Sequence, residues 1–296
     1  MADAWTIVPD LHADIDRARR LLDLGDPNVP QAFLGDFIDA SQDASHPDDA
    51  AVLALVRRQV AQGAVAVMGN HELNAILYHR TGVDGVALRS HNEKNKAQHR
   101  SFVRRFGTAT PEALDWTRWF LDLPLWLDLG GLRLVHACWS QPDIDLIAAR
   151  RPDGRLAEED LPEIAAEQSA FARAVNNLVT GPELPLPEGH GFHDAHGQER
   201  HRVRIAWWRS SARTWRDAAL SVPRPEELPQ GLVPRSDEVA FYPKDAPPVF
   251  MGHYKMQGAP RLEGPVTACL DYPESGCVYG WRGERRLHSD NLRVLD

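Results

Sequence analysis

The sequence has few cysteines, no long apolar run and no excess of positive charge, and each shortage excludes a class of protein. Its cysteines, Cys138, Cys269 and Cys277, are too few and too scattered for a disulfide framework or a CxxC zinc site, so we expect small core residues. The longest apolar runs span only about five to seven residues, against roughly 20 for a membrane helix. Residues 1–4 lack the basic start and apolar stretch of a signal peptide. We therefore expect a soluble, cytoplasmic protein with no membrane partner.

The charge balance is acidic. Asp and Glu number 42 against 33 Lys and Arg, which gives a net charge of −9 and an isoelectric point near 5.8. A general nucleic-acid binder normally presents a basic face, so we expect none here, although a local basic pocket is compatible with this balance. The 296 residues, 43% of them hydrophobic, suffice for a large core in one big domain or two small ones.

The first 75 residues alternate strand-like and helix-like segments. Strand patterns at 5–8, 32–34 and 64–68 are separated by helical patterns at 14–23 and 50–62. Asp14 is a plausible N-cap of the first helix, and Gly63 closes the second. This βαβαβ order predicts a parallel sheet covered by helices.

The rest of the chain continues the alternation, with one long interruption. The pattern is helical from 92 to 122 with a break at 107–110, and a hairpin is expected at 125–135. Strand signals return only at 249–251, 266–270, 277–281 and 292–295. We interpret residues 1–296 as a single domain in which a mostly helical, cap-like insertion at about 140–247 covers the sheet edge.

Metal-binding side chains follow several of these apolar strands. Divalent metals are bound by carboxylate oxygen and imidazole nitrogen, and a two-metal site needs a carboxylate that bridges ions about 3.5 to 4 Å apart. Asp10 and His12 lie two residues apart, so in an extended segment both point to one side. Strand ends that meet at one edge of a sheet would bring the candidates together. The candidates are Asp10, His12, Asp36, Asn70, His136 and His253.

Five short motifs carry a resemblance to a known family. They are DLH at 10–12, GDFID at 35–39, GNHE at 69–72, VHA at 135–137 and GHY at 252–254. In this order they resemble the blocks of the calcineurin-like metallophosphoesterase superfamily, in its phosphoprotein-phosphatase branch. MGHY together with ACLDY at 268–272 is most similar to the bacterial diadenosine tetraphosphatase group. The resemblance implies an α/β fold, a four-layer α/β/β/α sandwich with a metal centre at the strand ends.

The resemblance also implies roles for the residues. Asp10, His12 and Asp36 would hold one metal, and Asp36 would bridge to a second one held by Asn70, His136 and His253. We expect two divalent ions, with Mn first and Fe, Zn, Mg or Ni as alternatives. A hydroxide formed from metal-bound water would attack phosphorus. His71 would protonate the leaving group and Asp39 would orient His71.

Three residues depart from the family pattern. Pro9 and Ala13 replace the two glycines of the first block, and Pro9 fixes φ and removes an N–H. Ala40 stands where the family places an arginine that holds phosphate. The set of expected metal ligands is complete while a substrate contact is missing, which favours altered substrate handling over an inactive enzyme.

Replacement phosphate contacts have to come from other basic residues. A basic run comprises Arg89, Lys94, Lys96, Arg100 and Arg104. Within it we select Lys94 and its neighbour Asn95, because they begin a predicted helix. Arg204 is the other choice, since an arginine fork suits a nucleotide diphosphate.

We therefore expect a metal-dependent phosphohydrolase that acts on a small phosphorylated molecule, with a dinucleoside polyphosphate as the first candidate. The alternative within enzymes is a serine/threonine protein phosphatase. The alternative from another class is a non-catalytic, metal-containing module that binds phosphorylated ligands. The sequence does not define the metal or the oligomeric state.

Overall fold

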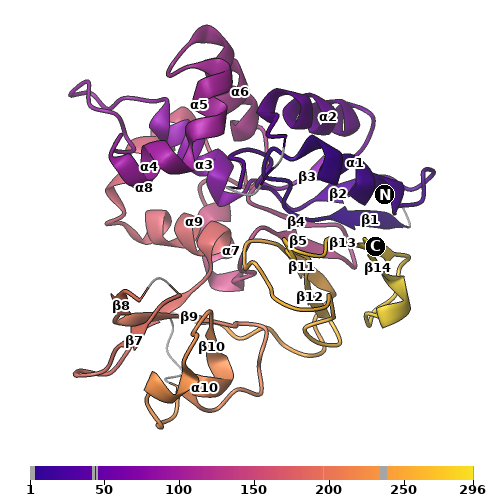
Figure 1. Cartoon of the computed structure of the whole chain (residues 1–296), viewed down its shortest axis with the longest axis vertical. Helices are drawn as coiled ribbons and strands as arrows, with labels where there is room; N and C mark the ends of the chain where they lie inside the picture. The colour runs from indigo at the N-terminus through magenta and orange to yellow at the C-terminus, as the bar shows by residue number, and fades with distance from the viewer. Residues whose placement is uncertain (1–3, 42–43, 45, 196, 234–238, 296) are drawn as a thin grey trace.

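A computed structural model describes residues 4–41, 44, 46–195, 197–233 and 239–295 (Figure 1). It has several sheets with helices packed around them. Within the described residues, no helix combines the length and the apolar character that spanning a bilayer requires. The three cysteines are buried and unpaired, as the sequence predicts.

The first main sheet is built from the N-terminal strands and the C-terminal end of the chain. Its order is β14-β13-β1-β2-β3. β1, β2 and β3 run parallel, while β13 is antiparallel to both β1 and β14. The strands are β1 (Trp5–Val8), β2 (Gln31–Phe33), β3 (Val65–Ala66), β13 (Cys277–Trp281) and β14 (Leu292–Val294). The predicted βαβαβ unit is therefore confirmed.

The second main sheet has the order β12-β11-β5-β4. β12, β11 and β5 run parallel, and β4 pairs with β5 as the expected antiparallel hairpin. Its strands are β4 (Trp126–Asp128), β5 (Arg133–Val135), β11 (Val249–Met251) and β12 (Thr267–Cys269).

Alternation along the strands shows how the layers stack. Ile7 and Leu34 belong to a core cluster that also contains Leu134 and Phe250 of the second sheet, so these faces meet each other. The next residue along β1, Val8, belongs to the cluster that contains the helical side chains. Since successive strand residues point to opposite faces, each sheet has one face on the other sheet and one on helices. This is the α/β/β/α sandwich that the sequence predicts.

The helices of the N-terminal half begin at clear capping residues. Asp14 accepts from the Arg17 N–H and so caps α1 as predicted. The expected break within 92–122 is present, because α5 ends before Gly107 and α6 starts at Pro111. The helices are α1 (Ile15–Asp23), α2 (Asp49–Ala61), α3 (Asn70–Tyr78), α4 (Glu93–Gln98), α5 (Arg100–Phe106) and α6 (Pro111–Leu121).

The segment between β5 and β11 is helical at first and then adds short strands. Its helices are α7 (Gln141–Ala148), α8 (Leu161–Ala166), α9 (Ala170–Thr180) and α10 (Trp215–Ala218). One small sheet has the order β10-β9-β6, and β7 pairs with β8. These strands are β6 (Glu183–Pro185), β7 (Phe192–His193), β8 (Glu199–Arg200), β9 (Arg202–Ile205) and β10 (Ala219–Leu220). Single 3₁₀ turns lie at Glu158–Asp160, Pro225–Glu227 and Ser289–Asn291.

Candidate metal centre

The predicted ligands follow the carboxyl ends of parallel strands in both main sheets. Asp36 follows β2, while His136 and His253 follow β5 and β11. Two groups of potential ligand atoms form there, and within each group the atoms lie within 4.8 Å of one another. The groups are His12, Asp36 and His71, in which His71 is the expected proton donor and not an expected ligand, and Asp36, His136 and His253. Asp36 is shared by both groups, which is the arrangement that a bridging carboxylate requires.

Backbone hydrogen bonds fix the Asp36 carboxylate and its loop. The His71 N–H donates to Asp36 Oδ1 over 2.9 Å. The buried Glu72 carboxylate accepts from the N–H groups of Asp36 and Phe37, both at 2.8 Å, and of Gly69 at 3.0 Å. The sequence suggests only a helix-start or supporting role for Glu72. The structure shows that Glu72 joins the second and third motifs.

Three acceptor atoms converge at His136. Its Nδ1 lies 2.7 Å from the Leu34 carbonyl, which only accepts, so Nδ1 carries a proton. The opposite nitrogen, Nε2, lies 3.1 Å from Asn70 Oδ1 and 3.3 Å from Asp36 Oδ2. Burial opposes a charge on the ring, yet Asp36 raises the pKa of His136 to about 10. Such a cluster of acceptors needs a cation, and these residue types fit a divalent metal.

Further buried polar atoms at the site have no hydrogen-bond partner among the described residues. They are Asp10 Oδ1, His12 Nε2 and His253 Nε2. Buried polar groups are normally paired, so these unpaired atoms also fit the role of metal ligands. Burial, followed by the charge of His71, lowers the pKa of His12 to about 4, which keeps its imidazole neutral and able to ligate.

The loops at the strand ends are strained and closely packed. Positive φ angles occur at His12 (45°), Asp36 (53°), Asp39 (64°) and His253 (72°). L-residues adopt this region at a cost, and such residues gather at functional sites. A Cβ at Gly69 would collide with Asp36 Oδ1, and one at Gly252 would collide with Asp10 Oδ1. These two glycines therefore allow the close approach that the ligands need.

Pro9 and Ala13 depart from the family pattern in the first motif, yet the loop of that motif still contacts the loop of Asp36. The N–H groups of Leu11 and His12 both donate to the Asp36 carbonyl over 2.9 Å. Ala13 adopts a φ of 56° and donates to the Phe37 carbonyl over 2.8 Å. Alanine thus takes the left-handed conformation that glycine adopts without strain.

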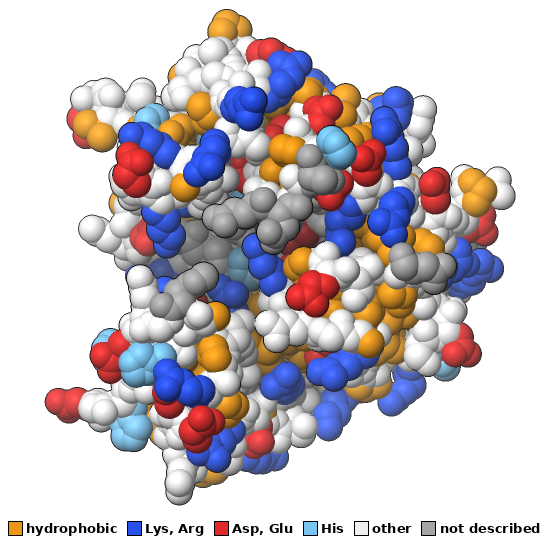
Figure 2. Space-filling model, viewed as in Figure 1, with side chains coloured by type: hydrophobic (Ala, Val, Ile, Leu, Met, Phe, Trp, Pro, Cys, Tyr) orange, Lys and Arg blue, Asp and Glu red, His pale blue; other side chains and the backbone are white. Residues whose placement is uncertain are grey.

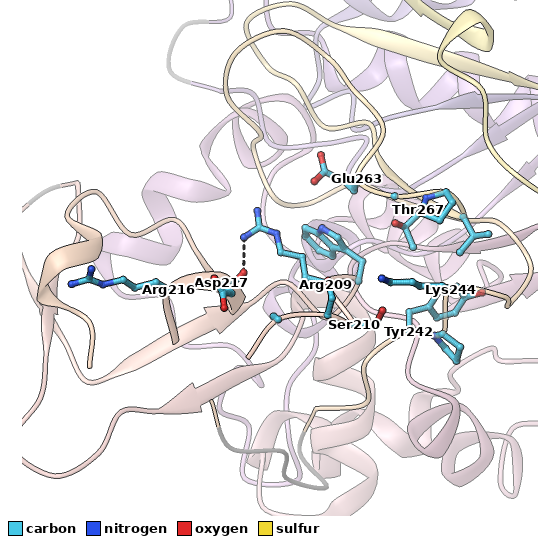
Figure 3. Close-up of a pocket in the computed structure, with 15 residues that line it drawn as sticks. Arg209, Ser210, Arg216, Asp217, Tyr242, Lys244, Glu263 and Thr267 are labelled. Atoms are coloured by element: carbon cyan, nitrogen blue, oxygen red, sulfur yellow. Dashed lines mark hydrogen bonds between the residues drawn. The ribbon is translucent and has the colours of Figure 1, made fainter. Parts of the chain in front are cut away.

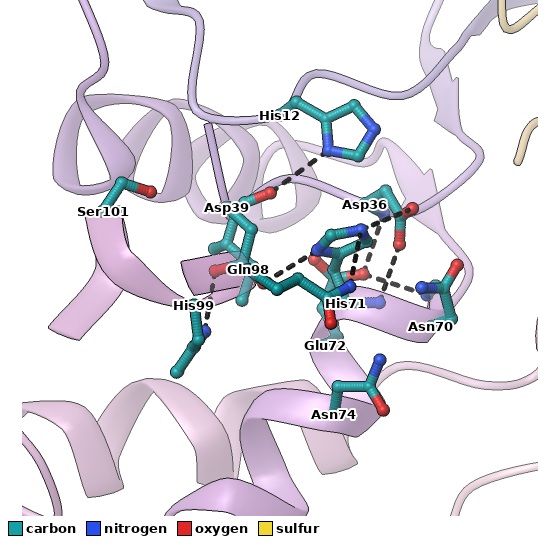
Figure 4. Close-up of polar contacts among 12 residues, drawn as sticks. His12, Asp36, Asp39, Asn70, His71, Glu72, Asn74, Gln98, His99 and Ser101 are labelled. Atoms are coloured by element: carbon teal, nitrogen blue, oxygen red, sulfur yellow. Dashed lines mark hydrogen bonds and ion pairs between the residues drawn. The ribbon is translucent and has the colours of Figure 1, made fainter. Parts of the chain in front are cut away.

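His71 and Asp39 form the expected pair. His71 Nδ1 lies 2.7 Å from Asp39 Oδ2, and Nε2 faces Asp36 Oδ2 at 3.8 Å (Figure 4). Burial opposes the charged ring, but Asp36 and Asp39 raise the pKa of His71 to about 9. The two carboxylates favour the protonated form of His71, and Asp39 holds its ring in one orientation, as a proton donor requires.

Two further histidines extend this pair, and no sequence motif indicates them. His99 Nδ1 lies 2.7 Å from Asp39 Oδ1, and His99 Nε2 lies 3.0 Å from His79 Nε2. The Ala109 N–H donates to His79 Nδ1, so the His79 proton is on Nε2 and points to His99. His99 must then donate to Asp39 through Nδ1. The chain of hydrogen bonds runs His79, His99, Asp39, His71.

The predicted substrate contacts differ in their placement. Arg204 of β9 lies near enough to the site for its charge to act on His253. Burial, the charge of His136 and then the charge of Arg204 hold the pKa of His253 well below its usual range. Its guanidinium carbon lies 5.8 Å from the Tyr254 ring centroid. Lys94 is exposed on α4, and its side chain forms no hydrogen bond or ion pair with a described residue. Asn95 is half-buried and accepts from Arg89.

Arg89 and Gln98 lie closer to the catalytic pair than Lys94 does. Gln98 Nε2 is 3.5 Å from His71 Nε2, and Gln98 Oε1 accepts from Arg89. The sequence places Arg89 in a basic run but does not distinguish it there. The amide-rich composition of 92–98, which includes Asn92, Asn95 and Gln98, is the one local signal that separates this run from an ordinary solvated helix.

Two of the cavities that lie outside the ligand cluster bear on the predicted basic residues and on the insertion. One of about 730 Å³ is lined by Ala40 and by Arg100 and Arg104 of α5. Another of about 670 Å³ is lined by Arg209, Tyr242 and other residues of the insertion and β12 region, and no proposed ligand lines it (Figure 3). Figure 2 shows basic and acidic side chains interspersed on the face viewed there, with no continuous basic patch.

Similarity to known proteins is shown at the level of the family. The profile of the calcineurin-like phosphoesterase family matches residues 6–274. A comparison with curated proteins finds no match. A solved structure provisionally assigned as a diadenosine tetraphosphatase is 15% identical, with 94% of this chain and 87% of that chain covered and a TM-score of 0.39. A protein serine/threonine phosphatase from Saccharomyces cerevisiae is 12% identical, with coverages of 98% and 78% and a TM-score of 0.47. A cold-active protein-tyrosine phosphatase from a psychrophilic Shewanella is 13% identical, with coverages of 100% and 83% and a TM-score of 0.46.

Proposed function

This chain belongs to the calcineurin-like phosphoesterase family, and from that membership we propose a site and a substrate class for it. It is a metal-dependent phosphohydrolase. We propose that it hydrolyses a phosphate ester or phosphoanhydride of a small molecule, with a dinucleoside polyphosphate as the leading candidate. The observation that carries the proposed site is the position of Asp36, which is common to both groups of ligand atoms.

Two divalent ions, Mn²⁺ first among them, are proposed for the ligand cluster. When bound, they supply charge stabilisation at phosphorus and a more acidic water. Asp10 and His12 would hold one ion, Asn70, His136 and His253 the other, and Asp36 both. The buried side-chain atoms of Asp10, His12 and His253 that have no described hydrogen-bond partner support this assignment.

Hydrolysis forms a bond between phosphorus and a water oxygen and breaks the bond to the leaving oxygen. We assign His71 to give its Nε2 proton to that leaving oxygen, because Asp39 already accepts from the opposite nitrogen. Asp39 fixes the ring and stabilises its charge. Burial opposes a charge on Asp39, but His99 and His71 hold its pKa below the usual range, so it stays a carboxylate.

Arg204 is proposed to contact the substrate from the insertion. Its buried Nε has no hydrogen-bond partner among the described residues, and its ion-pair contact with Glu183 is long, at 3.8 Å. A guanidinium with unused donors suits a phosphate. On this basis we propose that residues 140–247 form a cap within a single domain, 1–296. The cytoplasmic location and the small-molecule partner stay predictions.

A substrate screen with and without Mn²⁺ tests the proposal. The panel contains p-nitrophenyl phosphate, diadenosine tetraphosphate, nucleotides, sugar phosphates and phosphopeptides. We expect Mn²⁺-dependent turnover that Asp36→Asn lowers by about 10³-fold or more, since metal stabilisation is worth several kcal/mol. His71→Asn should lower it by about 10²- to 10⁴-fold. Asp23→Asn, an exposed change at the end of α1, is the matched control.

The results separate the alternatives. Wild-type rates in both site variants would exclude the assignment of Asp36 and His71. A preference for phosphopeptides would indicate a protein phosphatase. Two tightly bound ions without turnover of any substrate would indicate a binding module.

A further inference from the structure

Arg89 is a half-buried arginine whose hydrogen-bond acceptors are all neutral. It lies in the loop between α3 and α4. Its Nη1 donates to Asn74 Oδ1 over 2.6 Å, and its Nη2 donates to Asn95 Oδ1 over 3.1 Å and to Gln98 Oε1 over 3.0 Å. No described carboxylate forms an ion pair with it. Its charge is therefore held in place without being neutralised.

A partly buried guanidinium normally has an anionic partner. Amide oxygens satisfy N–H groups, but they do not offset the cost of burying a positive charge. Burial accordingly lowers the pKa of Arg89, and the carboxylates of Asp39 and Glu167 oppose that shift. Of the five N–H donors of an arginine, the three bonds above leave one on Nη1 and the one on Nε for another acceptor. A phosphate matches this fork.

Two of the amides that hold Arg89 lie on the helix that carries His71 or beside His71 itself. Asn74 lies four residues after Asn70 on α3, so the two share one helix face. Gln98 accepts from Arg89 through Oε1 and extends its Nε2 toward His71 Nε2, 3.5 Å away (Figure 4). One amide group therefore separates the guanidinium from the nitrogen assigned to protonate the leaving oxygen.

The neighbouring basic residues lack such a frame. Lys96 pairs with Glu93, and Arg100 is exposed on α5. Position 40, directly after Asp39, is an alanine and contributes no charge. Arg89 is thus the cation of this run that has both a fixed geometry and a place beside His71.

We propose that Arg89, held by Asn74, Asn95 and Gln98, binds a phosphate on the leaving-group side of the substrate, so that the enzyme prefers phosphoanhydrides to simple phosphate esters. This inference rests on the proposed function, because the leaving side is defined by His71. An anhydride releases a phosphate that carries negative charge to this side. The p-nitrophenolate that the ester releases has no phosphate group for Arg89 to bind.

The test compares two substrate types in the full-length, Mn²⁺-loaded enzyme. Values of kcat/KM are measured for diadenosine tetraphosphate and inorganic tripolyphosphate, and for p-nitrophenyl phosphate. We expect Arg89→Gln to lower the ratio of anhydride to ester by about 10- to 100-fold, mainly through KM for the anhydride, because a charged hydrogen-bond partner is lost. Arg89→Lys keeps the charge without the fork and should be intermediate.

A second variant tests the charge without removing the arginine. Asn95→Asp gives Arg89 an internal carboxylate of nearly unchanged shape, although it also removes the Asn95 Nδ2 donation to the Ser90 carbonyl. It should lower the ratio in the same direction. Arg100→Gln is the control, because this exposed arginine makes no described contact with the catalytic pair; its ratio should equal that of wild type. Thermal melting of each variant reports whether it folds.

The outcomes are distinct. An equal loss on both substrate types in Arg89→Gln would overturn the proposal and make Arg89 a support for His71. A change in Arg100→Gln without one in Arg89→Gln would also overturn it and place the anhydride in the Ala40 cavity. If wild type hydrolyses the ester but neither anhydride, the inference fails and the phosphoesterase assignment stands. If wild type hydrolyses nothing with bound Mn²⁺, the proposed function itself fails.

Discussion

The metal-ligand cluster and the region around Arg89 are built from different kinds of contact. In the cluster, main-chain groups fix the ligands: the His253 N–H donates to Asp10 Oδ2 over 3.0 Å, and Leu34 accepts from His136. Around Arg89 and His99, side chains contact side chains. A change of one side chain therefore has different consequences in the two regions.

Main-chain contacts tie the ligand cluster to the sandwich itself. A substitution there disturbs both metal binding and the loops that end the strands. Side-chain contacts can be exchanged while the backbone stays in place. This difference explains how position 40 can be an alanine while every proposed ligand is present, and it predicts where stability and chemistry can be separated.

A substitution of Glu72 should have the largest effect. It tests the ligand cluster, where main-chain contacts position the ligands. In Glu72→Gln an NH₂ group must face one of three N–H donors, from Asp36, Phe37 and Gly69. We expect a loss of about 1–3 kcal/mol in the free energy of unfolding. Metal affinity should fall by about 10- to 100-fold, as for other residues that support ligands. Urea denaturation and metal titration measure the two effects.

Glu93→Gln is the matched control, since Glu93 is exposed on α4 and pairs only with Lys96. It should change neither quantity. A Glu72→Gln protein with wild-type stability and metal affinity would contradict the view that main-chain contacts position the ligands.

The ligand cluster was predictable because each part of it is local in sequence. A strand, a turn and one or two polar residues recur at each motif, and the parallel strand ends of the two main sheets bring them together. The helices near the site were predictable for the same reason, since capping residues such as Asp14 act within three residues. The third strand is shorter than the predicted 64–68, because the Met68 N–H leaves the ladder and donates to the Pro124 carbonyl.

The surroundings of His71 were not predictable from local pattern. His99 lies 60 residues from Asp39 along the chain, and His79 lies 20 residues from His99. His99 also falls at the junction of α4 and α5, where a continuous helix was expected. Hydrophobic periodicity gives the face that a helix buries, but not the side-chain pairs formed between separate helices.

A substitution of His99 should have an intermediate effect. It tests the region around Arg89 and His99, where side chains contact side chains. His99→Phe keeps the stacking on Phe102, whose ring centroid lies 4.7 Å away, but removes the donor to Asp39. We expect kcat to fall by about tenfold, because a buried acceptor loses a partner worth about 1–3 kcal/mol. A less stabilised Asp39 should also attract the His71 proton more strongly and move the basic limb of the pH–rate profile upward.

The conservative variant distinguishes positioning from packing. The Nδ2 of an asparagine can take the place of His99 Nδ1, so His99→Asn should recover most of the lost rate. Metal content should equal that of wild type in both variants. Loss of metal in His99→Phe would show that the ligand cluster and the region around His99 are coupled, and it would contradict their separation.

A substitution of His79 should have the smallest effect at neutral pH. It tests whether a side chain near His99 contributes to stability separately from catalysis. Burial, followed by the charges of His99 and Arg80, lowers the pKa of His79 to about 3 from an ordinary value of 6.5. Because the folded pKa is the lower one, the stability it contributes is complete above pH 6.5 and is lost as the pH falls from 6.5 toward 3. His79→Gln does not titrate, so its free energy of unfolding should fall less steeply over this range, by up to about 1.4 kcal/mol per pH unit. Urea denaturation at pH 7, 6, 5 and 4 with a chelator present measures this slope without a contribution from metal release. The exposed variant His46→Gln should retain the wild-type slope, and an equal slope in His79→Gln would assign the acid sensitivity to the ligand cluster instead.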